Sequence, residues 1–262
     1  MNLQRFIEAK QGELRALRRA ASRGCMPLPQ PIGVRRRFRA SLEAAAASGA
    51  PLHVIAEFKK ASPSLGAIRL DAAPAEVARA YADAGAAAIS VLTEEKWFGG
   101  SVSDLAAAWP AGLPLLRKDF IFDPLQVEQT AATPASALLL IAALTPDAHL
   151  LQDLRSQAEG YGIEAVVEIV SREDLELARE SGASLIQVNA RNLETLATDR
   201  SMCLTLAGEK LPGEMWIAAS AMKTRSHLAE AACAGYDAAL VGSALMQAPD
   251  PGTALKKLLQ HP

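Results

Sequence analysis

Two acidic and two basic side chains, each near the end of a short apolar segment, are the residues best suited to acid–base chemistry: Glu57, Lys59, Lys118 and Glu168. Glu57 and Lys59 are two residues apart, so on a β-strand they point to the same side and can pair. Lys118 and Glu168 belong to different segments, so they can serve one substrate as separate acid and base. Buried charges are costly unless they are compensated. We therefore predict a catalytic cluster, with a structural ion-pair network as the alternative.

Further polar residues end the later apolar segments. Asn189 and Arg191 follow the sixth segment, and Ser220 ends the seventh. Gly242 and Ser243 lie where the eighth segment gives way to a helical pattern. At such a junction, free backbone N–H groups and the helix dipole can hold a phosphate group. The sequence therefore predicts a phosphate site after the eighth segment.

The elements that must position these residues alternate along the chain after about residue 50, which is typical of βα units in a parallel sheet. Three helical segments end at a glycine just before a strand, at Gly85, Gly182 and Gly235, whereas Pro134 stands at the corresponding place before the fourth strand. We expect that turn to differ. Eight strands are predicted, over residues 52–58, 86–93, 113–120, 137–144, 164–170, 185–190, 215–220 and 238–243.

Eight strands, each followed by a helix, predict an α/β fold of the (β/α)8 TIM-barrel type, with catalytic groups at the carboxyl ends of the strands. We expect one domain over residues 1–262, made of an N-terminal helical extension (1–50) and the barrel (51–262). Residues 3–22 have the pattern of an amphipathic helix that covers a barrel end or supports the rim of the site. Its apolar face would contain Leu3, Phe6, Ile7, Leu14 and Leu17.

Composition excludes several classes of partner. The net charge of −2 gives no general attraction to nucleic acid or to anionic membranes. A basic run at Arg35, Arg36, Arg37 and Arg39 has no interleaved aromatic residues, so we expect a solvated or barrel-packed segment and no nucleic-acid site. The longest apolar run, residues 137–144, is far shorter than the ~20 residues that span a bilayer.

The cysteines and histidines are scattered along the chain, with no CxxC pair and no spacing suited to zinc. The N-terminal segment has charged residues on every turn and does not resemble a secretory signal. We therefore expect reduced thiols, no metal, no membrane or nucleic-acid partner, and a cytoplasmic location.

Three segments carry a family resemblance: IAEFKKASPS (55–64), VLTEEKWFGGS (91–101) and LLRKDFIFDPLQVE (115–128). They resemble the indole-3-glycerol phosphate synthases of tryptophan biosynthesis, and the similarity continues through VVEIV, VNARNLET and LVGSALM. The resemblance implies a carboxy-lyase that needs no cofactor and acts as a monomer or weak homodimer. Its anionic substrate would be 1-(2-carboxyphenylamino)-1-deoxyribulose 5-phosphate, converted to indole-3-glycerol phosphate with loss of carbon dioxide and water.

The resemblance also implies roles for individual residues. Lys118 matches the general acid that protonates the ketose carbonyl, and Glu168 matches a carboxylate that removes a proton during dehydration. Lys59, oriented by Glu57, would hold the substrate carboxylate or donate a proton in a later step, and Asn189 would bond a sugar hydroxyl. The implied binding residues are Ser62, Gly242 and Ser243 for phosphate, with Arg191 nearby, and Phe98, Phe120 and Leu193 for the aromatic ring.

One motif departs from the family pattern. The seventh strand of the family usually ends in Glu-Ser-Gly, and this chain has Ala219, Ser220 and Ala221. One carboxylate is lost from the mouth, and Ala221 stands where a positive φ would favour glycine. Two alternatives therefore stay open: a diverged paralogue that acts on a related N-aryl ketose phosphate in specialised metabolism, and a non-catalytic barrel that only binds a phosphosugar.

Overall fold

Eight parallel strands close into a barrel in the computed structural model, which describes residues 3–31, 33, 35–43, 50–191 and 198–260. The (β/α)8 prediction is confirmed, because every strand pairs with two neighbours and the ring closes between the first and the last. The barrel strands are β1 (His53–Phe58), β4 (Ala88–Leu92), β5 (Leu115–Ile121), β6 (Ala137–Ile141), β7 (Glu164–Ile169), β8 (Leu185–Asn189), β9 (Met215–Ala219) and β10 (Ala238–Val241).

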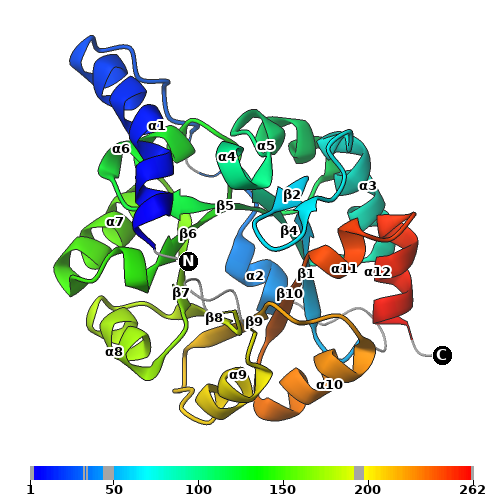
Figure 1. Cartoon of the computed structure of the whole chain (residues 1–262). Coiled ribbons are helices and arrows are strands. Elements are labelled where there is room, and N and C mark those ends of the chain that lie inside the picture. Colours follow the sequence, from blue (N-terminus) through cyan, green and yellow to red (C-terminus); the bar gives the residue numbers. More distant parts are fainter. Residues whose placement is uncertain (1–2, 32, 34, 44–49, 192–197, 261–262) are drawn as a thin grey trace.

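A ring of helices surrounds the strands, as the view along the barrel shows (Figure 1). Their apolar faces pack on the outward side chains of the strands and form the larger of two hydrophobic clusters. The ring consists of α3 (Pro74–Ala84), α5 (Ser103–Ala108), α6 (Pro124–Ala131), α7 (Ala148–Gly160), α8 (Arg172–Glu180), α9 (Arg200–Ala207), α10 (Arg225–Ala234), α11 (Ser243–Met246) and α12 (Pro251–Leu259). The short helix α4 (Glu95–Phe98) packs instead against the second cluster through Trp97 and Phe98.

One predicted strand limit is wrong, and one short hairpin was not predicted. The fourth barrel strand ends at Ile141 and not at residue 144, because Ala142–Leu144 form a 3-10 turn that the Thr145 hydroxyl caps by donating to the carbonyl of Ile141. A continuous apolar run hides such a turn, since its residues are apolar whether they belong to the strand or to the turn. The short hairpin of β2 (Ala61–Ser62) and β3 (Gly66–Ala67), after β1, was not predicted.

The turns before the strands follow the predicted glycine pattern. Gly85 and Gly235 cap their helices with φ of 95° and 101°, a left-handed conformation that a β-carbon would penalise. The helix before β6 ends differently, as expected from Pro134, because its cap at Ala132 keeps a right-handed conformation with φ −79°. The glycine caps at Gly85 and Gly235 and the different turn before β6 are therefore all visible in the sequence.

Side chains that point into the barrel form layers, because alternate tilted strands bring residues to the same height. Beneath the mouth the layers are mainly apolar, and a second hydrophobic cluster fills the barrel. Consecutive strand registers place Glu57, Lys118, Glu168 and Ala219 together in the mouth layer. The layer below contains Ser90, Leu139, Gln187 and Leu240.

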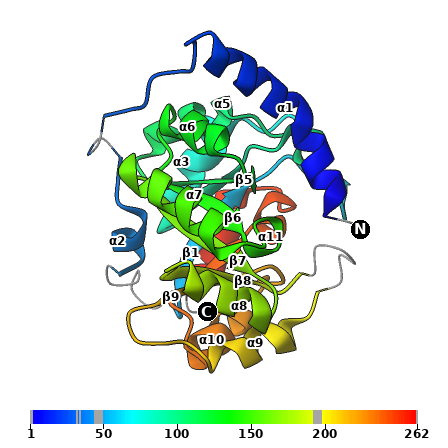
Figure 2. The same cartoon turned by 90° about the vertical axis from the view of Figure 1, so that its left-hand side faces the viewer.

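The N-terminal segment covers the barrel in two places. The helix α1 (Gln4–Ser22) lies outside the ring beside α6, and α2 (Phe38–Glu43) lies at the end of the barrel opposite the start of α1 (Figures 1 and 2). The backbone N–H of Phe38 donates to Glu164, the first residue of β7, at 2.6 Å, so α2 closes the amino ends of the strands. In the described part of the chain, no helix has the length and apolar character needed to cross a membrane.

Two arginines of the basic run pack against the barrel and the other two, Arg36 and Arg37, are exposed, in line with the prediction of a solvated or barrel-packed segment. Arg35 is buried and donates to the carbonyl oxygens of Tyr161 and Thr133, both at 3.1 Å. Arg39 donates to the carbonyl oxygen of Gly213 at 2.8 Å and forms an ion pair with Glu43 at 2.8 Å. These arginines therefore join the N-terminal extension to the barrel.

Candidate active site

A cavity of about 420 Å³ opens at the carboxyl ends of the strands. This volume lies in the range of small-molecule sites, about 300–1,000 Å³. Leu193 lies outside the described residues. Every other site residue predicted from the sequence lines this cavity: Glu57, Lys59, Ser62, Phe98, Lys118, Phe120, Glu168, Asn189, Arg191, Ser220, Gly242 and Ser243.

The four charged side chains alternate in sign across the floor of the cavity. Lys59 Nζ lies 2.7 Å from Glu57 Oε1, and Lys118 Nζ lies 3.9 Å from Glu57 Oε2. On its other side, Lys118 Nζ lies 3.4 Å from Glu168 Oε2. Lys118 is thus held between two carboxylates from different strands, with its ammonium group directed to the cavity.

Glu57 is ionised in this arrangement. Burial alone would raise the pKa of its carboxyl group, but the ammonium groups of Lys59 and Lys118 hold the pKa below its ordinary value. Because an ionised carboxylate can orient an ammonium but cannot donate a proton, Glu57 is suited to holding the two lysines and not to acting as an acid.

Glu168 is fixed by amide groups from the neighbouring strand β8. Asn189 Nδ2 donates to Glu168 Oε1 at 2.9 Å, and Gln187 Nε2 donates to Glu168 Oε2. Asn189 is held in turn by the Ser220 hydroxyl, which donates to its Oδ1 at 2.7 Å, and by the Arg191 N–H at 3.0 Å. The carboxylate therefore has one fixed orientation.

Gln187 was missed by the sequence reasoning. It is fully buried in the layer beneath the mouth, and its Oε1 has no hydrogen-bond partner among the described residues. Its sequence signal was a second amide residue, two positions before Asn189, inside the apolar segment LIQVNA. A buried amide in a strand core needs partners, and that requirement could have pointed to the carboxylate above it.

Gly242 has a steric role that the sequence did not reveal. A β-carbon at this position would lie 2.2 Å from Glu57 Oε1 and 3.1 Å from Glu57 Cβ. Glycine after β10 therefore makes room for the carboxylate on β1, in addition to its predicted place near phosphate. Ser62 and Ser243 lie on the same cavity, and the Ser62 hydroxyl accepts from the Leu65 N–H at 3.2 Å.

An aromatic wall closes another side of the cavity. The rings of Phe98 and Phe120 have centroids 6.3 Å apart. Phe6 of α1 stacks on Phe120 with centroids 4.2 Å apart and an interplanar angle of 21°, and it also lines the cavity. The N-terminal helix supports the rim of the site, as predicted, and Phe6 itself lines the cavity, which was not predicted.

The end of β9 has the backbone conformation suspected from its atypical motif. Ser220 and Ala221 have φ of 65° and 56°, and they are the only non-glycine residues with positive φ in the described ranges. The left-handed conformation costs a non-glycine residue roughly 1–2 kcal/mol. Ala219, the fourth member of the mouth layer, is buried and leaves this layer without a third carboxylate.

Replacing Ala221 with glycine is expected to raise the free energy of unfolding by about 0.5–1 kcal/mol. Glycine removes the left-handed penalty, and the greater conformational entropy that glycine gives the unfolded chain offsets only part of this gain. Urea denaturation measures the difference. Ala219→Gly is the control, since Ala219 lies in regular strand and glycine there should lower the stability. A loss of stability in both variants would show that the turn is not strained.

The chain is similar to proteins of one family over nearly its whole length. Residues 3–258 match the family model described as indole-3-glycerol phosphate synthase. An indole-3-glycerol phosphate synthase of Carboxydothermus hydrogenoformans is 46% identical over 79% of this chain and 78% of that protein. One from Burkholderia vietnamiensis is 39% identical over 98% of both chains.

Solved structures show the same fold at much lower identity. The 3-hexulose-6-phosphate synthase of Salmonella typhimurium superposes with a TM-score of 0.62 at 15% identity, covering 79% of this chain and 96% of that one. A likeness of this kind concerns the barrel alone.

Proposed function

Because the chain belongs to the indole-3-glycerol phosphate synthase family, we propose that its charged mouth layer carries out the ring closure of that family. The enzyme is a carboxy-lyase of tryptophan biosynthesis that converts 1-(2-carboxyphenylamino)-1-deoxyribulose 5-phosphate to indole-3-glycerol phosphate, carbon dioxide and water. The observation that supports our residue assignment is the alternation of two ammonium and two carboxylate groups on the cavity floor.

Ring closure requires an acid at the ketose carbonyl. The ring carbon that bears the carboxylate attacks the carbonyl carbon, and the electron pair of the C=O bond moves to oxygen. We assign the proton for this oxygen to Lys118, whose ammonium group lies in the middle of the layer, between Glu57 and Glu168. A positioned cation stabilises the developing charge and supplies the proton.

Carbon dioxide and water leave in the following steps. Loss of carbon dioxide returns the C–C electron pair to the ring. Glu168 then removes a proton from the carbon beside the nitrogen, and the hydroxyl group formed from the carbonyl leaves as water. Lys59, paired with Glu57 at 2.7 Å, donates the proton to that hydroxyl. Asn189, with its amide held by Ser220, contacts a sugar hydroxyl.

We assign the two ends of the substrate to different residues of the cavity lining. We place the phosphate at Ser62, Gly242 and Ser243, with Arg191 nearby, because backbone N–H groups and a guanidinium favour an anion. The aromatic ring would lie against Phe98 and Phe120, with Leu193 as the further wall residue expected from the sequence. We further propose that the enzyme works in the cytoplasm as a monomer or weak homodimer.

A turnover assay tests this function. Purified protein, with no added cofactor or metal, should release carbon dioxide and an indole-absorbing product in equal amounts from the carboxyphenylamino substrate. The control is the substrate with heat-denatured protein. Correctly folded protein that gives neither product would refute the proposed function, and tight substrate binding without carbon dioxide release would favour a non-catalytic barrel.

A further inference from the structure

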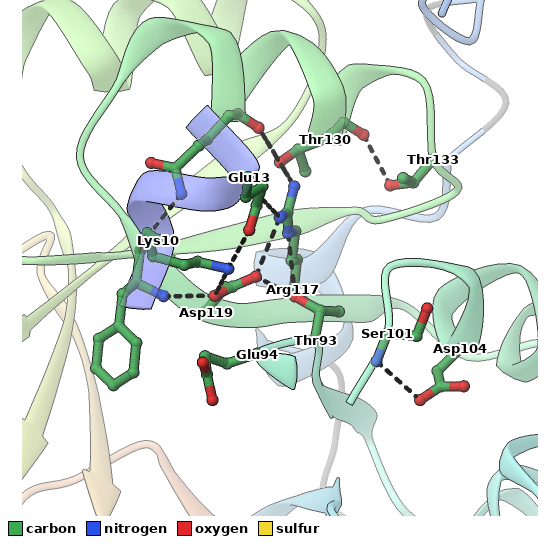
Figure 3. Close-up of polar contacts among 12 residues, drawn as sticks. Lys10, Glu13, Thr93, Glu94, Ser101, Asp104, Arg117, Asp119, Thr130 and Thr133 are labelled. Carbon is green, nitrogen blue, oxygen red and sulfur yellow. Dashed lines mark hydrogen bonds and ion pairs between the residues drawn. The ribbon is translucent and has the colours of Figure 1, made fainter. Parts of the chain in front are cut away.

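The helix α1 places a lysine inside the protein. Lys10 is 3% exposed, although the sequence predicted an apolar face on this helix. It lies on that face, one turn after Phe6 and one turn before Leu14, both of which are buried. Its Nζ forms an ion pair with Asp119 Oδ1 at 2.6 Å and another with Glu13 (Figure 3).

Asp119 accepts from four donors and is completely enclosed. Oδ1 accepts from Lys10 and from the Phe120 N–H at 2.8 Å, while Oδ2 accepts from the Thr93 hydroxyl at 2.6 Å and from Arg117 at 3.0 Å. Figure 3 shows these side chains directed toward the one carboxylate. Burial alone would raise the pKa of Asp119, but Arg117 and Lys10 hold it below its ordinary value. A carboxylate held this firmly fixes the strand that carries it.

That strand is the one that carries Lys118. Side chains alternate across a strand, so the Asp119 side chain leaves β5 on the side opposite to Lys118 and Phe120, toward α1, where Lys10 binds it. On α1, Phe6 stacks on Phe120, and Lys10 binds Asp119 one turn later. The helix therefore contacts β5 through two consecutive residues that directly follow Lys118.

The same carboxylate also reaches the neighbouring strand. Thr93, which donates to Asp119, follows β4 and precedes Glu94. Glu94 accepts from the N–H groups of Trp97 at 2.7 Å and Phe98 at 3.2 Å, which fixes the short helix α4 and its wall residue. Through Asp119, the docking of α1 is thus connected with both the acid and the aromatic wall.

We propose that Lys10 is a positioning residue of the active site, which acts through Asp119 to hold Lys118 and the Phe98–Phe120 wall in place. This inference rests on the proposed function and assigns part of it to the N-terminal helix. Lys10 does not contact the substrate. Its removal should disturb the geometry of groups that do, and a small misplacement of catalytic groups can cost about 100-fold in rate.

The test compares substitutions of two basic residues that anchor α1, Lys10 and Arg18. Lys10→Met is expected to lower kcat by about 10- to 100-fold and to weaken substrate binding, because the acid and the wall both shift. Arg18→Met removes a separate ion pair of α1, that of Arg18 with Asp123 after β5 at 3.1 Å, where the arginine side chain is 58% exposed. This control should leave kcat and KM unchanged. Lys10→Arg, which keeps the cation, should restore most of the activity.

Two further measurements separate the possible failures. Binding of the reduced substrate, an alcohol that cannot close the ring, should weaken about 10-fold in Lys10→Met whether or not the wild type turns over. Lys10→Gln replaces Lys10→Met if the methionine variant does not fold. A folded variant that is merely less stable, with unchanged kcat and binding, would overturn the inference. If the wild type binds the reduced substrate but does not convert the carboxyphenylamino substrate itself, the proposed function fails and Lys10 is judged on binding alone.

Discussion

Replacement of Lys118 with methionine is expected to lower kcat by about 10²- to 10⁴-fold, the range that a general acid contributes. Methionine keeps the length of the side chain but cannot protonate the carbonyl oxygen. The fold should persist, because Glu57 retains its ion pair with Lys59 at 2.7 Å and Glu168 retains the amide groups of Asn189 and Gln187. Steady-state kinetics on protein whose circular dichroism matches the wild type measures the effect.

Lys60→Met is the matched control for this experiment. Lys60 belongs to the same end of the barrel as Lys59, but it forms an ion pair with Asp104 at 3.1 Å and does not line the cavity. Its loss should leave kcat within about twofold of the wild type, as for a substitution away from the reacting atoms. If Lys118→Met keeps more than a tenth of the wild-type kcat, the acid of ring closure is another group, and Lys59 is the first candidate.

Glu168→Gln is expected to lower the formation of the indole product by about 10²- to 10³-fold, because the amide cannot accept the proton that is lost during dehydration. The substitution should be tolerated locally. Gln187 can turn its amide so that Oε1, which has no partner in the described part of the chain, accepts from the new amide group. The loss should therefore lie in chemistry and not in folding.

The order of product release makes this second experiment specific. Ring closure and loss of carbon dioxide precede the step assigned to Glu168, so a single turnover of Glu168→Gln should release carbon dioxide before the indole absorbance appears. Glu164→Gln, on the same strand but at its amino end beside Phe38, is the control and should affect stability only. If carbon dioxide and indole are lost to the same extent, Glu168 acts at or before ring closure.

The barrel was predictable because its signals are local. Apolar segments of strand length alternate with helices, and glycines such as Gly85 and Gly235 end helices just before strands. The charged residues could be placed at the mouth because strand ends of a parallel barrel meet at one end. The strand limits were less certain, as the 3-10 turn at Ala142–Leu144 shows.

The parts that could not be predicted depend on contacts between distant segments. Nothing near Lys10 in the sequence indicates that it binds Asp119, and both belong to patterns that alone predict exposed or rim positions. The need for glycine at position 242 arises only from the carboxylate of Glu57, a residue on the strand at the other end of the chain. Family resemblance predicts the reacting groups, whereas the contacts that hold them are seen only in the structure.

The contact between Glu57 and Gly242 lies where the first and the last barrel strands meet, since β1 pairs with β10 from His53 with Ala238 to Ala56 with Val241. A nascent chain has made β1 long before β10 leaves the ribosome, and no half of the barrel contains both. The space that holds the Glu57 carboxylate is therefore completed only when the ring closes. We expect a chain that lacks β10 to leave Glu57 without the backbone that packs against its carboxylate.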